Sequence, residues 1–211
     1  MNRKLTTLDL LAAGALGASA LGTAWVYDRL PDPMPTHFDL HGLPNGWMPR
    51  AVGAFVLPAV GVLVWALVRF GGRLLSREGR ERLTSSPLDA VGLLVAGMMA
   101  AIQSLVIDAA LMPSPRLGSG VWLVLGVFFV LLGQVLPRVR RNPFIGVRTA
   151  WTLSSDENWA RTHRFAGYTM SGAGALAVLA ALAGAPAVGL ACVLMGALAP
   201  ALYSWRLARS A

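Results

Sequence analysis

Long apolar runs constrain this chain most, because a run of about 20 apolar residues crosses the hydrocarbon core of a bilayer as one helix. The sequence of 211 residues contains six runs that reach or approach this length. They cover residues 8–26, 51–70, 88–112, 121–136, 167–182 and 188–205. Backbone polar groups in lipid must be paired within the protein, so each run is expected to be helical. We therefore predict an all-α polytopic membrane protein with six transmembrane helices.

Composition separates this chain from soluble proteins. Hydrophobic residues make up 55% of the sequence and charged residues only 13%, against about 25% charged residues in a soluble domain. The net charge of +8 would suggest nucleic acid in a soluble chain. The single cysteine, Cys192, lies in an apolar run and is expected to be a packing residue. Composition thus argues against a soluble enzyme and against a nucleic-acid-binding domain.

The distribution of lysine and arginine sets the predicted orientation. Six spans place both termini and the loops after the second and fourth runs on one side, and these segments hold 15 of the 18 basic residues. The other side holds Arg29, Arg50 and Arg116. Since cytoplasmic loops carry the excess of basic residues, both termini are predicted to be cytoplasmic.

The first apolar run has a second interpretation. Basic residues, an apolar run and Ala18-Ser19-Ala20 also resemble a signal peptide with a cleavage site. The run continues through Val26, however, and is then long enough to span a membrane. We expect a retained helix.

The loop 28–50 is predicted to be external and ordered, because four prolines between residues 31 and 44 restrict its backbone. His37, Asp39 and His41 form the pattern H-x-D-x-H, and in an extended segment their side chains share one face. Two imidazoles and a carboxylate are zinc ligands. The alternative is a polar surface loop with a His–Asp hydrogen bond, since a zinc site normally has a further ligand.

The loop 137–167 is predicted to be cytoplasmic and to carry a short amphipathic helix. Ser154 and Glu157 fit a capping box, which predicts a helix from about residue 155 to residue 164. This helix is expected to lie at the membrane surface before the fifth span. Glu157 and Arg161 form an i,i+4 pair of favourable polarity.

The same loop offers a candidate binding face. Trp159 and His163 are four residues apart and share one side of the predicted helix, and Arg148 precedes them. An arginine beside these rings suits a lipid phosphate or a partner carboxylate. The alternative is that arginine and tryptophan only anchor the loop in the membrane interface. Within the spans, Gln103 is expected to bond a neighbouring helix.

Two stretches of the sequence resemble known families. Residues 30–47 resemble a domain of unknown function, DUF1648, through Pro35, His37, Phe38 and Gly42; His41 departs from the small residue usual there, which weakens the zinc interpretation. Residues 141–167 resemble the C-terminal signature of the SdpI family of bacterial membrane proteins. That signature, N-x-x-x-G-[IV]-R-T-x-W-T followed by a tryptophan and T-H-R-x-x-G, is carried by Asn142, Gly146, Arg148, Thr149, Trp151, Thr152, Trp159, Thr162, His163, Arg164 and Gly167.

The resemblance implies two regions and a function. Residues 1–70 would be DUF1648-like, with two transmembrane helices and the external loop, and residues 71–211 SdpI-like, with four transmembrane helices and the signature loop 137–167. The protein would lie in the bacterial plasma membrane, give immunity to a secreted peptide toxin, and signal the toxin by recruiting a cytoplasmic repressor. The expected partners are therefore the lipid bilayer, a toxin outside and a repressor inside, with no direct contact to nucleic acid.

The same resemblance implies which residues act. Inside the cell they would be the signature residues named above, and outside they would be His37, Phe38, Asp39, Gly42 and Trp47. No cofactor is expected, apart from the open question of zinc at His37 and His41. The alternative function is a membrane-embedded enzyme, or a lipid- or metal-binding protein, that uses the face of Arg148, Trp159 and His163.

Overall fold

The computed structural model describes residues 5–70, 87–114 and 116–209. The regular secondary structure of the described residues is helical apart from one antiparallel pair of strands, β1 (Met34–Phe38) and β2 (Pro44–Met48). The helices are α1 (Thr7–Val26), α2 (Arg50–Gly53), α3 (Val56–Phe70), α5 (Leu88–Leu111), α6 (Gly120–Val135), α7 (Ala150–Ser154), α8 (Asp156–Leu182) and α9 (Pro186–Arg209). Single turns of 3-10 helix, Tyr27–Arg29 and Leu136–Arg138, follow α1 and α6.

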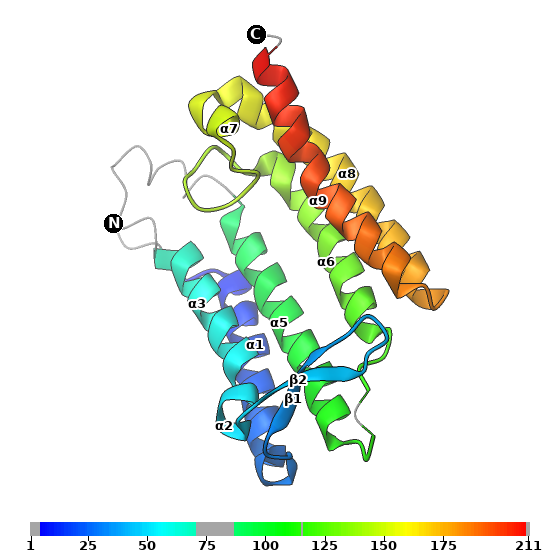
Figure 1. The fold of residues 1–211 in the computed structure, drawn as a ribbon. Helices are drawn as coiled ribbons and strands as arrows, with labels where there is room; N and C mark the ends of the chain where they lie inside the picture. The colour runs from blue at the N-terminus through cyan, green and yellow to red at the C-terminus, as the bar shows by residue number, and fades with distance from the viewer. Residues whose placement is uncertain (1–4, 71–86, 115, 210–211) are drawn as a thin grey trace.

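The long helices form two groups of three that lie side by side (Figure 1). In one group α5 packs against α1 and α3, in the other α8 packs against α6 and α9, and contact between α5 and α6 joins the groups. Within the described residues, five helices are long and apolar enough to cross a membrane. The chain is thus a multi-pass membrane protein, and the second predicted span is the one that falls short, because α3 has only 15 residues.

A proline explains why α3 is short. Pro58 has no N–H, so the carbonyl of Ala54, four residues earlier, lacks its helical donor, and the helix is interrupted there. The Gln103 amide donates to this carbonyl at 2.7 Å and lies 3.4 Å from the hydroxyl of Thr23. Gln103 is only 1% exposed. The expectation that it bonds a neighbouring helix is confirmed, and it joins α5 to α1 and to the break between α2 and α3.

Glycines bring α6 and α8 into close contact. A methyl group added at Gly133 would lie 2.8 Å from the carbonyl oxygen of Gly167. One added at Gly174 would lie 2.6 Å from the backbone nitrogen of Val130. Small residues let membrane helices approach this closely, so this interface depends on them.

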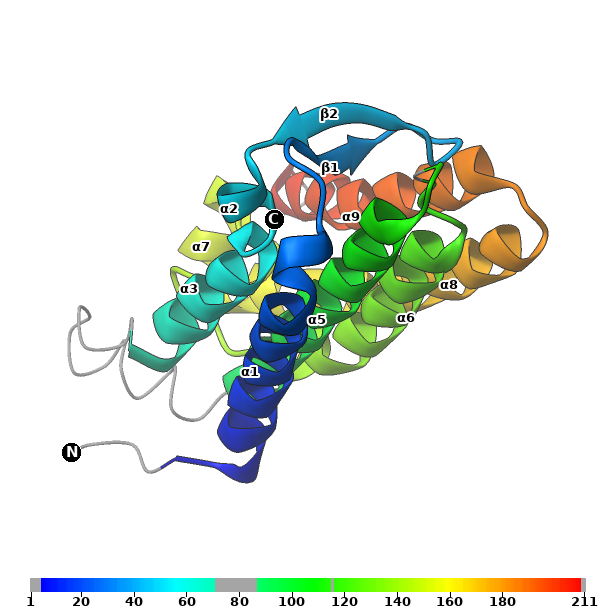
Figure 2. The same cartoon turned by 90° about the horizontal axis from the view of Figure 1, so that it is seen from below.

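The two ends of the helix bundle carry different structures. The hairpin β1–β2 lies across one end, and the loop 139–149 lies with α7 and the C-terminus of α9 at the other (Figure 1). Seen from below, the hairpin reaches from α2 to the α5–α6 connection (Figure 2), where the Leu117 N–H donates to the Gly42 carbonyl at 2.8 Å. We refer to these as the hairpin end and the signature-loop end.

The prediction of a separate surface helix before the fifth span is wrong. Residues 156–164 are the first turns of α8, which continues without interruption to Leu182. The segment continues along the axis of α8 and does not lie on the membrane surface, because its buried side chains pack against the loop 139–147. Its cap is Ser155, which accepts from the Asn158 N–H at 3.2 Å, and not Ser154. The Glu157–Arg161 ion pair is present at 3.4 Å. The basic loop predicted after the second span lies outside the described residues.

Candidate functional site

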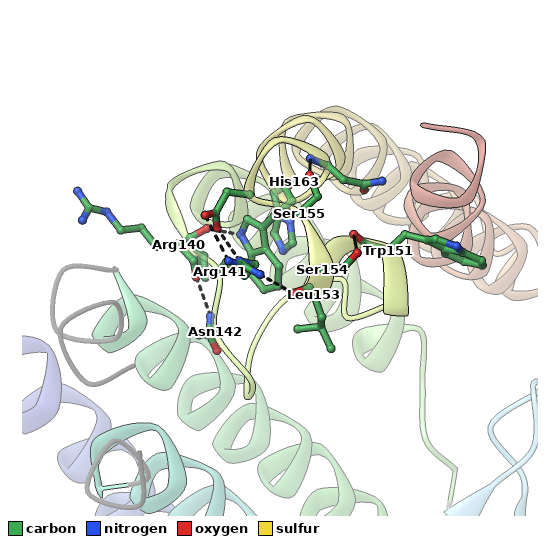
Figure 3. A network of polar contacts seen from close by, with 12 residues as sticks. Arg140, Arg141, Asn142, Trp151, Leu153, Ser154, Ser155 and His163 are labelled. Carbon is green, nitrogen blue, oxygen red and sulfur yellow. Dashed lines mark hydrogen bonds and ion pairs between the residues drawn. The ribbon is translucent and has the colours of Figure 1, made fainter. Parts of the chain in front are cut away.

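The turn that opens the signature loop is organised by one side chain, Asn142 (Figure 3). Its amide nitrogen donates to the carbonyls of Arg140 and Ile145 at 2.9 and 3.0 Å. Its amide oxygen accepts from the N–H groups of Phe144 and Ile145, both at 2.8 Å. One buried amide therefore satisfies four backbone groups that have no regular secondary structure to pair with.

Gly146 brings the loop back over two aromatic rings. Its φ of +122° is in the region that favours glycine. An added methyl group would collide with the His163 ring and lie 3.1 Å from the Trp159 indole. Trp159 and His163 stack with centroids 4.1 Å apart, and the indole N–H donates to the Val139 carbonyl at 2.8 Å. The loop, the indole and the imidazole thus form one packed layer.

Hydrogen bonds fix the proton on His163. Nε2 accepts from the Val147 N–H at 3.1 Å, so it carries no proton. Nδ1 lies 2.9 Å from the Trp159 carbonyl and therefore donates to it. This is the neutral imidazole with its proton on Nδ1. His163 is fully buried and links the loop to α8.

Threonines and one serine fasten the next part of the loop to α9. Thr149 caps α7 together with Thr152, and the Thr152 hydroxyl donates to the Val147 carbonyl at 2.8 Å. The Thr149 hydroxyl lies 3.0 Å from that of Ser204. The Asn158 amide donates to the Ser204 carbonyl at 2.9 Å and accepts from Thr162 at 3.0 Å. The signature residues therefore tie the loop, α7, α8 and α9 together.

The predicted binding face of Arg148, Trp159 and His163 is not formed. Trp159 is 3% exposed and His163 is fully buried, whereas Arg148 is exposed. The buried pair lies beneath Gly146, so a ligand reaches neither ring. Trp151 is exposed and points away from His163 (Figure 3). Most signature side chains are therefore parts of the loop's internal packing, and Arg148, Trp151 and Arg164 are its accessible members.

At the hairpin end, His37, Asp39 and His41 do not converge. The Asp39 carboxylate accepts from the N–H groups of His41 and Leu43 at 2.8 and 2.9 Å, which turns it toward the backbone. His37 Nδ1 lies 2.5 Å from the side-chain oxygen of Asn45. Among the described residues, no three His, Cys, Asp or Glu side chains are grouped to hold a metal ion. The strand alternation that predicted a shared face does not reach these residues, because β1 ends at Phe38 and Asp39 and His41 lie in the turn that follows it.

Gly42 lets the hairpin backbone pack closely against the connection between α5 and α6. It has φ +77°, and an added methyl group would collide with the Leu117 carbonyl of the α5–α6 connection. Phe38 packs on the apolar cluster formed by Leu30, Met34 and the end of α5, and Trp47 is exposed. Phe38 and Gly42 thus hold the hairpin in place.

A cavity of about 570 Å³ lies beneath the hairpin. Leu57, Ile102 and Val106 line it from α3 and α5, and α6 and the α8–α9 turn line the other side. His37, His41 and Arg116 add polar groups. The sequence patterns did not predict this cavity. Its one available signal was Arg116, a basic residue on the side that has few of them.

The fold and its two ends define a multi-pass membrane protein with a cavity under a hairpin at one end and a fastened polar loop at the other. The profile described as the SdpI/YfhL protein family matches residues 138–204, and the profile of DUF1648 matches residues 14–62. The chain therefore carries an SdpI-family domain and a DUF1648 domain, as the two sequence motifs predicted. Comparison with curated proteins and with solved structures gives no match.

Proposed function

We propose that this chain is an immunity protein of the bacterial plasma membrane that captures a secreted apolar peptide toxin in the cavity beneath the hairpin. In this proposal the hairpin end faces outward and both termini are cytoplasmic, as the 15-to-3 distribution of basic residues favours. The observation that carries the proposal is the cavity, because it is large, apolar in its floor and placed at the end that would meet a secreted molecule.

The chemistry of the cavity suits a peptide. Leu57, Ile102 and Val106 offer apolar surface to hydrophobic side chains, and a volume of about 570 Å³ accommodates several of them. Arg116 and His41 can donate hydrogen bonds to peptide carbonyls or a terminal carboxylate. Asp39 lines the cavity too, but its carboxylate already accepts from two backbone N–H groups. The cavity therefore favours an apolar ligand with acceptor groups.

The arrangement also supports a signalling role within the same proposal. The cavity has walls from both helix groups, so a ligand that closes it would shift α6, α8 and α9 relative to α5. The signature loop is fastened to α8 and α9 at their far end and would move with them. Arg148 and Trp151 are exposed there and would contact a cytoplasmic repressor. Such an output requires that the toxin bind one arrangement more tightly than the other.

Filling the cavity tests the proposal. The chain is expressed in a bacterium that is killed by secreted peptide toxins, and survival is scored. Gly118 lines the cavity and has nothing within 4 Å of an added methyl group, so Gly118→Trp can occupy the space without displacing backbone. Gly22→Trp is the matched control, because Gly22 is exposed on α1, outside the cavity, and equally unhindered.

We expect the wild type and Gly22→Trp to protect and Gly118→Trp to lose protection, with equal amounts of all three in the membrane. Full protection by Gly118→Trp would show that the cavity is not the toxin site. If the wild type protects against none of the toxins, the immunity function itself is refuted.

A further inference from the structure

A groove between α6 and α8 opens at the signature-loop end of the bundle. Its volume is about 330 Å³, and its floor is the close approach of Gly133 and Gly167. Its walls carry Arg138, Arg164 and Tyr168. Both arginines are exposed, and Tyr168 is 80% exposed although it belongs to a helix apolar enough to span a membrane.

The charge of this groove is positive and uncompensated. Among the described residues that line it, two are arginines and none is acidic. The two acidic residues at the start of α8 are engaged elsewhere: Asp156 pairs with Arg141, and Glu157 pairs with Arg161. An anion in the groove would therefore meet two guanidinium groups, which bind phosphate with paired N–H donors.

Two further side chains on the walls, Gln134 and Ser171, are already hydrogen-bonded. The Gln134 amide donates to the Ser171 hydroxyl at 2.9 Å, and Ser171 donates to the Val130 carbonyl at 3.3 Å. Arg138 donates to the Gln134 carbonyl through one of its terminal nitrogens and has further donors available. Arg138 and Arg164 are therefore the groups in this groove that still have N–H donors available for a ligand.

The face of α8 beyond the groove suits an acyl chain. Leu179 lies eleven residues after Tyr168, so it has nearly the same direction around the helix, and it is 60% exposed. Gly172, between them, is exposed and has open space around an added methyl group. Exposed tyrosine is typical of the headgroup level of a membrane. The arginines would then lie at the phosphate level and the apolar face at the acyl level.

We propose that this groove binds an anionic phospholipid, with the headgroup phosphate between Arg138 and Arg164 and an acyl chain along α8 over Gly172. Anionic lipids attract clustered arginines at the membrane surface, and two arginines without an acidic neighbour favour a headgroup of net negative charge over a zwitterionic one. This inference does not depend on the toxin or on the cavity beneath the hairpin.

Native mass spectrometry of the full chain in detergent tests it, with added phosphatidylglycerol or phosphatidylcholine. We expect the wild type to retain phosphatidylglycerol preferentially. Arg164→Gln should weaken that binding about fivefold, the effect of removing one basic residue beside an anionic headgroup. Arg148→Gln removes the same charge from an exposed site at the same end but outside the groove, and it should bind like the wild type. Gly172→Trp should block the acyl chain and weaken binding with both arginines intact.

The remaining outcomes count against the proposal. Equal retention of both lipids would remove the preference for an anionic headgroup, and unchanged binding by Arg164→Gln would remove the groove as its site. Displacement of phosphatidylglycerol by millimolar inorganic phosphate would identify a soluble-phosphate site and overturn the lipid assignment. Unchanged thermal unfolding in phosphatidylcholine confirms that each variant is folded.

Discussion

Gly146 shows how much of the signature loop depends on one missing side chain. At φ +122° and against the rings of His163 and Trp159, alanine would be strained and would also displace the stack. We expect Gly146→Ala to lower the free energy of unfolding by about 2–4 kcal/mol. Gly184→Ala is the control, since Gly184 has φ +69° but open space, and it should cost about 1 kcal/mol. Equal costs in thermal or denaturant unfolding would contradict the packed layer.

His163 and Arg148 are predicted to fail in different ways. His163→Ala leaves the buried Val147 N–H without its acceptor and removes a fully buried ring, which should cost about 2–4 kcal/mol. Arg148→Ala removes an exposed side chain and should change stability by less than about 0.5 kcal/mol. If Arg148 contacts the repressor, its variant loses reporter output while keeping both stability and protection. Repressor output that survives in Arg148→Ala would exclude Arg148 from that contact.

At the scale of single residues, the sequence patterns predicted which residues matter, but the binding roles predicted for them were wrong. The spacing of Trp159 and His163 correctly predicts one shared helix face, which is a local property. Whether that face is covered depends on residues 139–147 returning across it, a non-local contact that spacing does not encode. Asp39 is similar: its residue type suits a zinc ligand, and it equally suits the turn that it caps.

Among the elements, the hairpin is held on the helices by the packing of Phe38 and by one close backbone contact at Gly42. Gly42 packs against the Leu117 carbonyl, and alanine there would be strained and would displace that backbone. We expect Gly42→Ala to release the hairpin, so that added protease cleaves within residues 34–48 at least tenfold faster. Gly118→Ala, one residue beyond Leu117 and unhindered, should be cleaved like the wild type. Slow cleavage of both variants would show that Phe38 packing and strand pairing hold the hairpin without the close contact at Gly42.

Helix existence was predictable and helix continuity was not. Five of the six apolar runs lie in helices with the length and composition of membrane spans, because hydropathy reports that property directly. The interruption at Ala54 could be anticipated only by weighing Pro58, and its repair by Gln103 depends on a neighbouring helix. The predicted end of the helix at residue 164 was wrong, because a capping residue indicates where a helix starts and not where it ends.

For the whole molecule, six crossings stay a prediction, and it requires the ends of successive long helices to alternate between the two ends of the bundle. Among the described residues, α1, α5 and α8 end at the hairpin end, and α3, α6 and α9 end at the signature-loop end (Figure 1). Although α3 is short, its last turn reaches α1, where Arg69 pairs with the buried Asp9 at 3.4 Å. The last turn of α3 therefore lies beside the first turn of α1. If α3 crosses the membrane, the DUF1648 region contributes two spans, and this stays a prediction.

Cysteine labelling tests this arrangement together with its orientation. Single cysteines at Asn45 and Ser119, both at the hairpin end, should react with a membrane-impermeant maleimide in intact cells. A cysteine at Glu157, whose side chain is 78% exposed at the signature-loop end, should react only after the membrane is opened. A cysteine at Arg80, outside the described residues, should behave like Glu157 if α3 crosses and like Asn45 if it does not. Cys192 is buried and gives a low background. Labelling of Glu157 but not Asn45 in intact cells would invert the orientation and leave the cavity facing the cytoplasm, where no secreted peptide could reach it.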